Sequence, residues 1–312
     1  MIDLIIPVYK NKKGLRTTLE SVNFNVFNVT VVEDGSNEIH GLKWPVKVIK
    51  QKNAGPGQAR QRGINETSNP YIMFIDAGDV FTSKEVQEKI AETIAANPSV
   101  DVFQWQYYYK DKLTGPQDNR LHGKVYKRVF LKYHGITFSK AGSYLDEDIG
   151  FNRTCRLILR SRGLYYKYIE EPVIKWVEDR TSVTQKDGRA SLYRDQTKGL
   201  ALNSIHCLNI CGGKVNDYFL RMEINEIACA LYYWFIQTAL NRPEFLNDAW
   251  QGAKIFFDRY GNKISSIDAS QGSRRFIQII KDAEKVPFRI NLVRFIYDIH
   301  SFKNVPKWYC GK

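Results

Sequence analysis

The sequence predicts an α/β fold with a mainly parallel sheet, followed by a mainly helical C-terminal region. Two observations predict the sheet: short β-branched runs alternate with amphipathic stretches, and the apolar run 71–75 stops at a pair of aspartates. The helical region is predicted by long helical periods from about Gln185, with no strand of similar strength. With 43% hydrophobic and 13% aromatic residues, the 312-residue chain is neither disordered nor collagen-like.

The expected elements follow the order of βαβ units. Pro7 ends the first strand, and the almost wholly apolar run 71–75 is expected to be a buried central strand. The segment 110–124 is rich in Gly, Pro, Asp and Asn, which predicts a loop. The expected strands are 4–6, 29–32, 46–49, 71–75, 100–109 and 165–176, and the expected helices are 13–22, 59–64, 84–96, 151–162, 218–240 and 248–260.

The charge balance of +13 predicts polyanionic partners, such as nucleic acid, nucleotide phosphates or an anionic membrane surface. Residues 185–312 hold 19 basic and 12 acidic side chains, so both parts of the chain share the excess. No apolar run approaches the roughly 20 residues that span a bilayer, and the N-terminus lacks the pattern of a signal peptide. A cytoplasmic protein is therefore expected.

The cysteine pattern predicts reduced thiols, because an odd number spread over a long chain does not resemble a disulfide scaffold. Cys207 and Cys211 have a spacing that permits a shared helix face, but no second pair or nearby histidine completes a zinc site. The five cysteines are Cys155, Cys207, Cys211, Cys229 and Cys310.

Carboxylates follow several of the expected strands and turns. Glu33 and Asp34 precede a Gly-Ser pair, Asp76 and Asp79 follow the central strand, and 146–148 is an acidic triplet. In one α/β domain, this arrangement suits a phosphate ester neutralised by a divalent cation with oxygen ligands. Each carboxylate taken alone has a plainer interpretation as a solvated turn or a helix cap.

The segment 53–60, Asn-Ala-Gly-Pro-Gly-Gln-Ala-Arg, is a glycine-bearing loop that opens an expected helix. The free amides and the dipole of a helix N-terminus favour phosphate. Its spacing is neither G-x-G-x-x-G nor a Walker loop, which argues against a dinucleotide enzyme or a P-loop kinase.

The order of these motifs closely resembles family 2 glycosyltransferases of the GT-A fold, over about residues 1–184. The nucleotide-side motifs are Ile5-Ile6-Pro7-Val8-Tyr9, Val31-Val32-Glu33-Asp34-Gly35-Ser36, the loop 53–63 and Tyr71-Ile72-Met73-Phe74-Ile75-Asp76-Ala77-Gly78-Asp79. The acceptor-side motifs are Gly123-Lys124-Val125-Tyr126, Glu147-Asp148-Ile149-Gly150-Phe151-Asn152, Glu171-Pro172-Val173 and Thr181-Ser182-Val183-Thr184. The resemblance implies a GT-A catalytic domain at 1–184, built on a mixed sheet flanked by helices. It has a nucleotide-sugar half at 1–100 and an acceptor half at 101–184, and a helical domain at 185–312 follows.

The resemblance also implies where a nucleoside-diphosphate sugar, usually UDP-linked, would bind. The base would be held by Pro7, Tyr9 and Asp34, and Arg60 would approach the base or the diphosphate. Asp76 matches the first aspartate of the family's Asp-x-Asp-type motif, beside the ribose and a Mg²⁺ or Mn²⁺ ion. The usual third position of that motif is Gly78 here. Either Asp79 takes its place, so that Asp76 and Asp79 are the metal ligands, or the metal is held mainly by the diphosphate.

Asp148 matches the catalytic base of the inverting members. An acceptor hydroxyl is a poor nucleophile, so a carboxylate must take its proton as it attacks the anomeric carbon. Asp146 and Glu147 are expected to be supporting or surface carboxylates.

Two further features have two interpretations each. His122 either contacts the donor phosphate or the acceptor, or is an ordinary loop histidine. The aromatic run of Trp105, Tyr107, Tyr108 and Tyr109 either forms a stacking platform for a sugar or base, or is core and sheet surface.

The acceptor is expected to be a hydroxylated base in duplex DNA, because the net charge of +13 suits a DNA backbone and the motifs look like phage-encoded members of the family. Such an enzyme would act in the host cytoplasm. The alternatives are a cell-envelope glycan or lipid-linked sugar as acceptor, with peripheral membrane contact, a nucleotidyltransferase, and a non-catalytic nucleic-acid-binding module.

Overall fold

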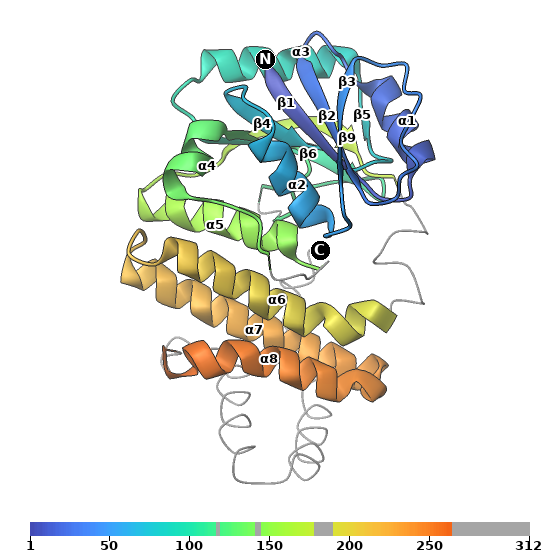
Figure 1. Cartoon of the computed structure of the whole chain (residues 1–312). Coiled ribbons are helices and arrows are strands. Elements are labelled where there is room, and N and C mark those ends of the chain that lie inside the picture. The colour runs from blue at the N-terminus through green and yellow to red at the C-terminus, as the bar shows by residue number, and fades with distance from the viewer. Residues whose placement is uncertain (117–118, 141–144, 178–189, 264–312) are drawn as a thin grey trace. The chain divides into compact units, whose positions relative to one another are not determined.

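A computed structural model of the chain describes residues 1–116, 119–140, 145–177 and 190–263. The chain divides into two compact units, residues 1–183 and 184–312 (Figure 1). Cys310 and the expected Thr181–Thr184 motif lie outside the described residues.

The first unit is built on one nine-stranded mixed sheet, in the order β3-β2-β1-β4-β8-β6-β9-β5, with β7 paired to β6. Strands β1 to β4 run parallel, β8 is antiparallel to both β4 and β6, and β9 runs parallel to β6. The predicted mixed sheet is therefore confirmed. The strands are β1 (Ile2–Val8), β2 (Phe27–Asp34), β3 (Val46–Gln51), β4 (Tyr71–Phe74), β5 (Val80–Phe81), β6 (Val102–Tyr109), β7 (Lys112–Leu113), β8 (Lys124–Lys127) and β9 (Lys167–Lys175).

Five helices accompany this sheet; three of them begin earlier than predicted, and the one at Arg128–His134 was not predicted. Helix α2 begins at Pro56, which suits a first helical position because proline lacks an N–H that would be unpaired there. Helix α5 begins at Glu147, where two acidic side chains complement the helix dipole. The segment 110–124, predicted as a loop, contains β7 because Tyr108 and Tyr109 pair with its two residues. The helices are α1 (Lys12–Ser21), α2 (Pro56–Asn65), α3 (Lys84–Ala96), α4 (Arg128–His134) and α5 (Glu147–Ser161).

An aromatic cluster fixes α5 against the sheet. The ring of Phe151 on α5 stacks on Phe138, with centroids 4.3 Å apart, and meets Phe74 of β4 edge-on. The hydroxyl of Tyr126 on β8 donates to the Asn152 side chain at 2.6 Å. These contacts hold the first turn of α5, with Glu147 and Asp148, in a set position relative to β4 and β8.

A buried ion pair ties α4 to the first strand. The Asp3 side chain is fully buried and accepts hydrogen bonds from Arg128 at 2.7 Å, from Asn28 and from Asn69. Burial raises the pKa of Asp3, but these hydrogen bonds and the charge of Arg128 outweigh it and hold the pKa below its ordinary value.

Replacing Asp3 by Ala is therefore expected to lower the free energy of unfolding by about 3–5 kcal/mol, because Arg128 loses its buried partner. Urea denaturation measures the change. Lys47→Ala, which breaks an exposed pair with Glu66, is the control and should change stability by less than about 0.5 kcal/mol. Equal losses in the two variants would contradict the prediction.

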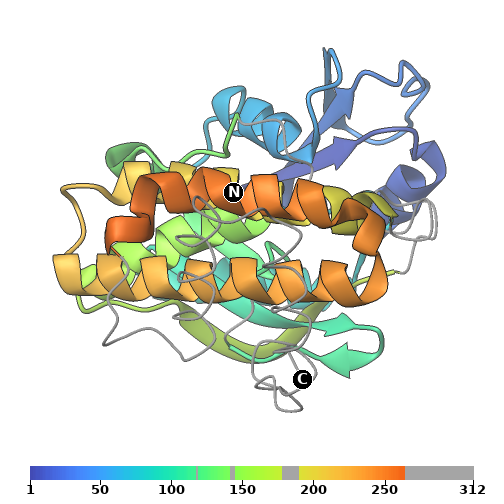
Figure 2. The ribbon, with the colours of Figure 1, turned by 90° about the horizontal axis from the view of Figure 1, so that it is seen from below.

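The second unit is helical in its described part, as predicted. Helices α6 (Ala190–Cys211), α7 (Asp217–Asn241) and α8 (Leu246–Tyr260) lie side by side (Figure 2). A 3₁₀ turn at Pro243–Phe245 joins α7 to α8, and another at Gly261–Lys263 follows α8. They share a core that includes Leu231, Phe235 and Phe256. Within 190–263, no helix is long and apolar enough to cross a membrane.

The four described cysteines form no disulfide with one another, and neither Cys207 nor Cys211 belongs to a metal-binding group of described residues.

Candidate active site

The carboxyl ends of the parallel strands meet at one edge of the sheet. Strands β1, β2 and β4 run the same way, and β6 and β9 share their direction because β8 is antiparallel to both β4 and β6. Open α/β sheets bind ligands at this edge. It carries the implied base-binding residues: Pro7 lies near the end of β1, Tyr9 directly follows that strand, and Asp34 is the last residue of β2. The turn Asp76–Asp79 follows β4 at the same edge.

Asp34 holds the loop that opens α2. Its side chain is buried and accepts the N–H groups of Ala54 and Gly55, each at 2.8 Å. Gly35, with φ +83°, lets the chain pass close to Asn53, where a Cβ would lie 2.6 Å from the Asn53 nitrogen. Asp34 therefore shapes the end of β2. Its neighbour Glu33 is a turn-forming carboxylate that accepts the N–H of Glu38 at 2.6 Å.

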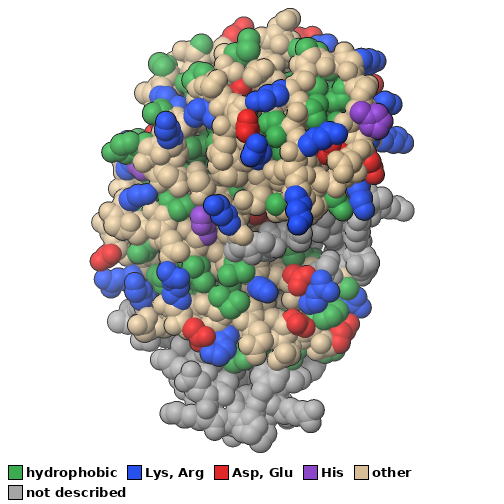
Figure 3. Space-filling view, viewed as in Figure 1, with side chains coloured by type: hydrophobic (Ala, Val, Ile, Leu, Met, Phe, Trp, Pro, Cys, Tyr) green, Lys and Arg blue, Asp and Glu red, His purple; other side chains and the backbone are tan. Residues whose placement is uncertain are grey.

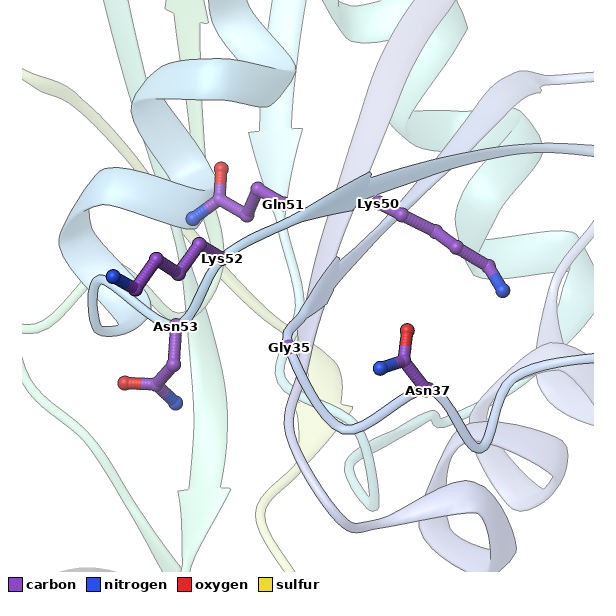
Figure 4. Close-up of a pocket in the computed structure, with 6 residues that line it drawn as sticks. All are labelled: Gly35, Asn37, Lys50, Gln51, Lys52 and Asn53. Carbon is purple, nitrogen blue, oxygen red and sulfur yellow. The ribbon is translucent and has the colours of Figure 1, made fainter.

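A hollow of about 500 Å³ lies beside Gly35, the residue after β2 (Figure 4). Two lysines on its wall give it a positive charge, which suits an anionic ligand. Its lining residues are Gly35, Asn37, Lys50, Gln51, Lys52 and Asn53.

The turn Asp76–Asp79 is clamped by α1. The Asn11 side chain donates to the Ala77 carbonyl at 2.8 Å, and the Thr18 hydroxyl donates to the Asp79 carbonyl at 2.7 Å. Gly78 has φ +121°, a conformation that side chains with a Cβ rarely adopt. The glycine in the usual place of an aspartate therefore allows the turn that brings Asp79 back beside Asp76.

Asp76, Asp79 and His122 form a group that fits a divalent cation. One ligand atom from each lies within 4.8 Å of the others. His122 Nε2 lies 2.9 Å from Asp79 and 3.8 Å from Asp76, and its ring stacks on Tyr107 with centroids 5.0 Å apart. Burial raises the pKa of Asp79 despite its bond to His122. Two carboxylates and an imidazole are donors that suit Mn²⁺.

Arg60 joins this group to α5. Its guanidinium donates to Asp76 at 2.6 Å and to Glu147 at 2.8 Å, and its side chain is only 6% exposed. Partial burial alone would raise the pKa of Asp76, but the charge of Arg60 holds it below its ordinary value. The described ion pairs of Arg60 are thus with carboxylates. That Arg60 approaches the base or the diphosphate of the donor stays a prediction.

Glu147 and Asp148 occupy the first turn of α5. Burial, followed by the nearby charge of Asp148, raises the pKa of Glu147 to about 8 although Arg60 opposes the shift. Gly57 permits this packing, because a Cβ there would lie 2.9 Å from the Glu147 Cγ. Glu147 is thus a buried partner of Arg60 rather than a surface carboxylate. Of the two alternatives expected from the sequence, this position agrees with a supporting carboxylate.

Asp148 is half-buried, and one of its oxygens accepts the Ile149 N–H at 2.8 Å. Burial raises the pKa of Asp148, with Arg60 opposing. A carboxylate with a raised pKa is a stronger base when ionised. Four carboxyl groups, those of Asp76, Asp79, Glu147 and Asp148, thus lie near one arginine and one histidine, and a divalent cation beside Asp76 and Asp79 would favour their ionised forms.

Sequence reasoning did not identify His122 as a member of the cation-binding group. The residue lies just before a Gly-Lys turn that leads into β8, and β8 is antiparallel to β4, so its start lies at the same edge as the end of β4. Of the aromatic run, Trp105 and Tyr107 are fully buried, which agrees with the core interpretation for those two residues.

The mixed sheet and the carboxylates at its edge define the class of GT-A nucleotide-sugar-binding folds. The sequence model of glycosyl transferase family 2 matches residues 3–165, more than half of the chain, and the protein belongs to this family.

The chain is 26% identical over 243 residues to an uncharacterized glycosyltransferase of Escherichia coli, YibD, covering 64% of this chain and 66% of that protein. It is 23% identical over 226 residues to a putative glycosyltransferase of Bacillus subtilis, EpsH, covering 59% and 63%. The matched region thus spans less than two thirds of either relative.

Among solved structures, residues 1–349 of Staphylococcus aureus TarS in complex with UDP-GlcNAc have a TM-score of 0.64. The identity is 16% and the coverage 91% of each chain, so this likeness concerns the fold.

Proposed function

We propose that the protein is an inverting glycosyltransferase that transfers a sugar from a UDP-sugar to an acceptor hydroxyl. The observation that carries the proposal is the continuous link from the cation-binding group through Asp76, Arg60 and Glu147 to Asp148. This link supports Asp148 as a base near the donor-binding edge of the sheet. The UDP-GlcNAc complex of the structural neighbour TarS supports the choice of donor.

In this proposal, Pro7, Tyr9 and Asp34 hold the nucleotide base, and Asp76, Asp79 and His122 hold Mn²⁺ or Mg²⁺. The bound cation would neutralise the diphosphate leaving group. Arg60 keeps Asp76 and Glu147 in place and adds positive charge near the leaving group.

Asp148 takes the proton of the acceptor hydroxyl. The acceptor oxygen forms a bond to the anomeric carbon while the bond from that carbon to the diphosphate oxygen breaks, and the electron pair leaves with UDP. A single in-line displacement inverts the configuration. A non-catalytic module would need neither a base nor cation ligands, so the grouping of Asp76, Asp79 and His122 favours an enzyme.

A hydroxylated base in duplex DNA, the finer expectation from the sequence, is a second candidate acceptor. The observation that favours it is the net charge of +13. Figure 3, however, shows Lys and Arg side chains spread over both units rather than gathered in one stripe on the face in view. Affinity for duplex DNA that falls steeply with salt would support this acceptor, and absence of binding at low salt would exclude it.

The test of the proposed function is UDP release from UDP-glucose, UDP-galactose and UDP-GlcNAc, measured with Mn²⁺ and with EDTA. We expect release from at least one donor with Mn²⁺ and loss of that activity with EDTA. No turnover with any donor, despite a folded protein, would contradict the proposal.

Replacing Asp79 by Asn or His122 by Gln is expected to weaken Mn²⁺ binding by about 100-fold, because each change removes one of three ligands. Titration of Mn²⁺ followed by electron paramagnetic resonance measures free and bound ion directly. His40→Gln, which changes an exposed histidine, is the matched control and should bind like the unchanged protein. Equal affinity in all proteins would remove Asp79 and His122 from the metal site.

A further inference from the structure

Two half-buried aromatic rings end neighbouring strands at the active edge. Tyr109 is the last residue of β6, and Trp176 directly follows β9. Their ring centroids lie 4.8 Å apart at an interplanar angle of 44°. The guanidinium of Arg120 lies over the Tyr109 ring, 4.1 Å from its centroid. Trp105 and Tyr107, earlier on the same strand, are fully buried, so the aromatic run changes from core to surface as it reaches the edge.

A chain of side-chain contacts connects this aromatic pair to the cation-binding group. Arg120 donates to the Tyr107 hydroxyl at 3.0 Å, and the Tyr107 ring stacks on His122. His122 in turn bonds to Asp79 at 2.9 Å.

A second connection runs through the main chain. The N–H of Val177, the residue after Trp176, donates to the other oxygen of Asp79 at 3.1 Å. Trp176 is also held to β6, because its N–H donates to the Tyr108 carbonyl at 2.8 Å. The positions of Tyr109 and Trp176 are therefore fixed, by two independent routes, relative to the place where the sugar would be transferred.

We propose that Tyr109, Trp176 and Arg120 form an acceptor subsite that binds a carbohydrate ring; this proposal rests on the proposed glycosyl transfer. Partly exposed aromatic rings offer apolar faces to the C–H groups of a sugar, and a nearby guanidinium donates hydrogen bonds to hydroxyls. The two rings are in contact with each other and leave no slot for a flipped base between them. A sugar ring laid on the outer surface of the pair needs no such slot.

The test compares acceptor use with acceptor-independent donor hydrolysis. The variants are Trp176→Leu, which removes the ring, and Trp176→Phe, which keeps an aromatic face. Tyr165→Leu is the matched control, because Tyr165 is 76% exposed and lies away from this edge in the turn after α5. The acceptor probes are cellotetraose, chitotetraose, maltotetraose and a duplex oligonucleotide with hydroxymethylated cytosine.

We expect at least one oligosaccharide to be an acceptor, with a KM that rises about 10-fold or more in Trp176→Leu. Trp176→Phe should recover most of the affinity, and UDP release without acceptor should stay within about twofold in every variant. A KM for the oligosaccharide that is unchanged in Trp176→Leu would overturn the subsite. So would UDP release that no oligosaccharide converts into transfer, or transfer to the duplex alone.

If no donor is hydrolysed at all, the proposed function fails, and the subsite is still tested by binding. Quenching of tryptophan fluorescence by the same oligosaccharides, compared between the unchanged protein and Trp176→Phe, then reports directly on this position. Quenching that disappears in Trp176→Phe supports the subsite, and absence of quenching in the unchanged protein overturns it.

Discussion

Replacing Asp148 by Asn is expected to lower the rate of sugar transfer by about 10³-fold and to leave donor affinity within about threefold. Asparagine keeps the shape of the side chain but cannot accept the proton of the acceptor hydroxyl, and general-base catalysis contributes about 10²–10⁴-fold in enzymes. Among the described residues, Asp148 forms no hydrogen bond or ion pair with Asp76, Asp79 or His122, and the longer-range effects of His122 and Asp76 on its pKa are smaller than those of burial and Arg60, so donor and cation binding should persist. Rates come from UDP release with acceptor present, and donor affinity from isothermal titration calorimetry.

Asp111→Asn is the matched control for this prediction. Asp111 is exposed, and its positive φ of 58° is a conformation that asparagine adopts readily. The rate of sugar transfer by the Asp111→Asn protein should therefore be unchanged. A rate in Asp148→Asn within tenfold of the unchanged protein would remove Asp148 as the base. Full tolerance of the change would favour the nucleotidyltransferase alternative, which needs no base on α5.

The main elements of the first unit were predictable because its strands are short, apolar and separated by strong turn residues. The central strand β4 and the carboxylates after it follow from the run 71–75 alone. The sequence also indicated that Asp76 and Asp79 share one turn. It did not indicate why glycine stands between them. The turn that requires a positive φ at Gly78 is held by hydrogen bonds from Asn11, the N-cap of α1, and from Thr18 on that helix, both about sixty residues away in the sequence.

His122 and Glu147 show what local reasoning could not reach. His122 joins the aspartates only through the antiparallel pairing of β8 with β4, a contact between segments about fifty residues apart. Glu147 reads as a surface carboxylate in an acidic triplet, and its burial depends on the closeness of α2, which Gly57 allows. Both residues owe their roles to tertiary contacts, which leave no periodic pattern in the sequence.

Replacing Arg60 by Met is expected to lower the free energy of unfolding of the metal-free protein by about 3–5 kcal/mol. The change leaves Glu147 without its buried partner and removes the charge that stabilises ionised Asp76. Urea denaturation in EDTA measures the loss. Arg62→Met, on the same helix, is the matched control, because the Arg62 side chain is 51% exposed and pairs with Glu66 at the surface. It should cost less than about 1 kcal/mol.

The loss of unfolding free energy in Arg60→Met should grow as pH rises, because Glu147 ionises at higher pH. With a pKa of about 8 in the folded protein and an ordinary value of 4.5, Glu147 holds a proton between these pH values that the unfolded chain does not. Its contribution to stability is therefore present below pH 4.5 and is lost as pH rises through about 8. Without Arg60, ionised Glu147 is costlier still, so the loss in Arg60→Met should be larger at pH 8.5 than at pH 6. Adding Glu147→Gln should recover more of the stability at pH 8.5 than at pH 6, whereas equal recovery at both would show that the charge of Glu147 is not the cause.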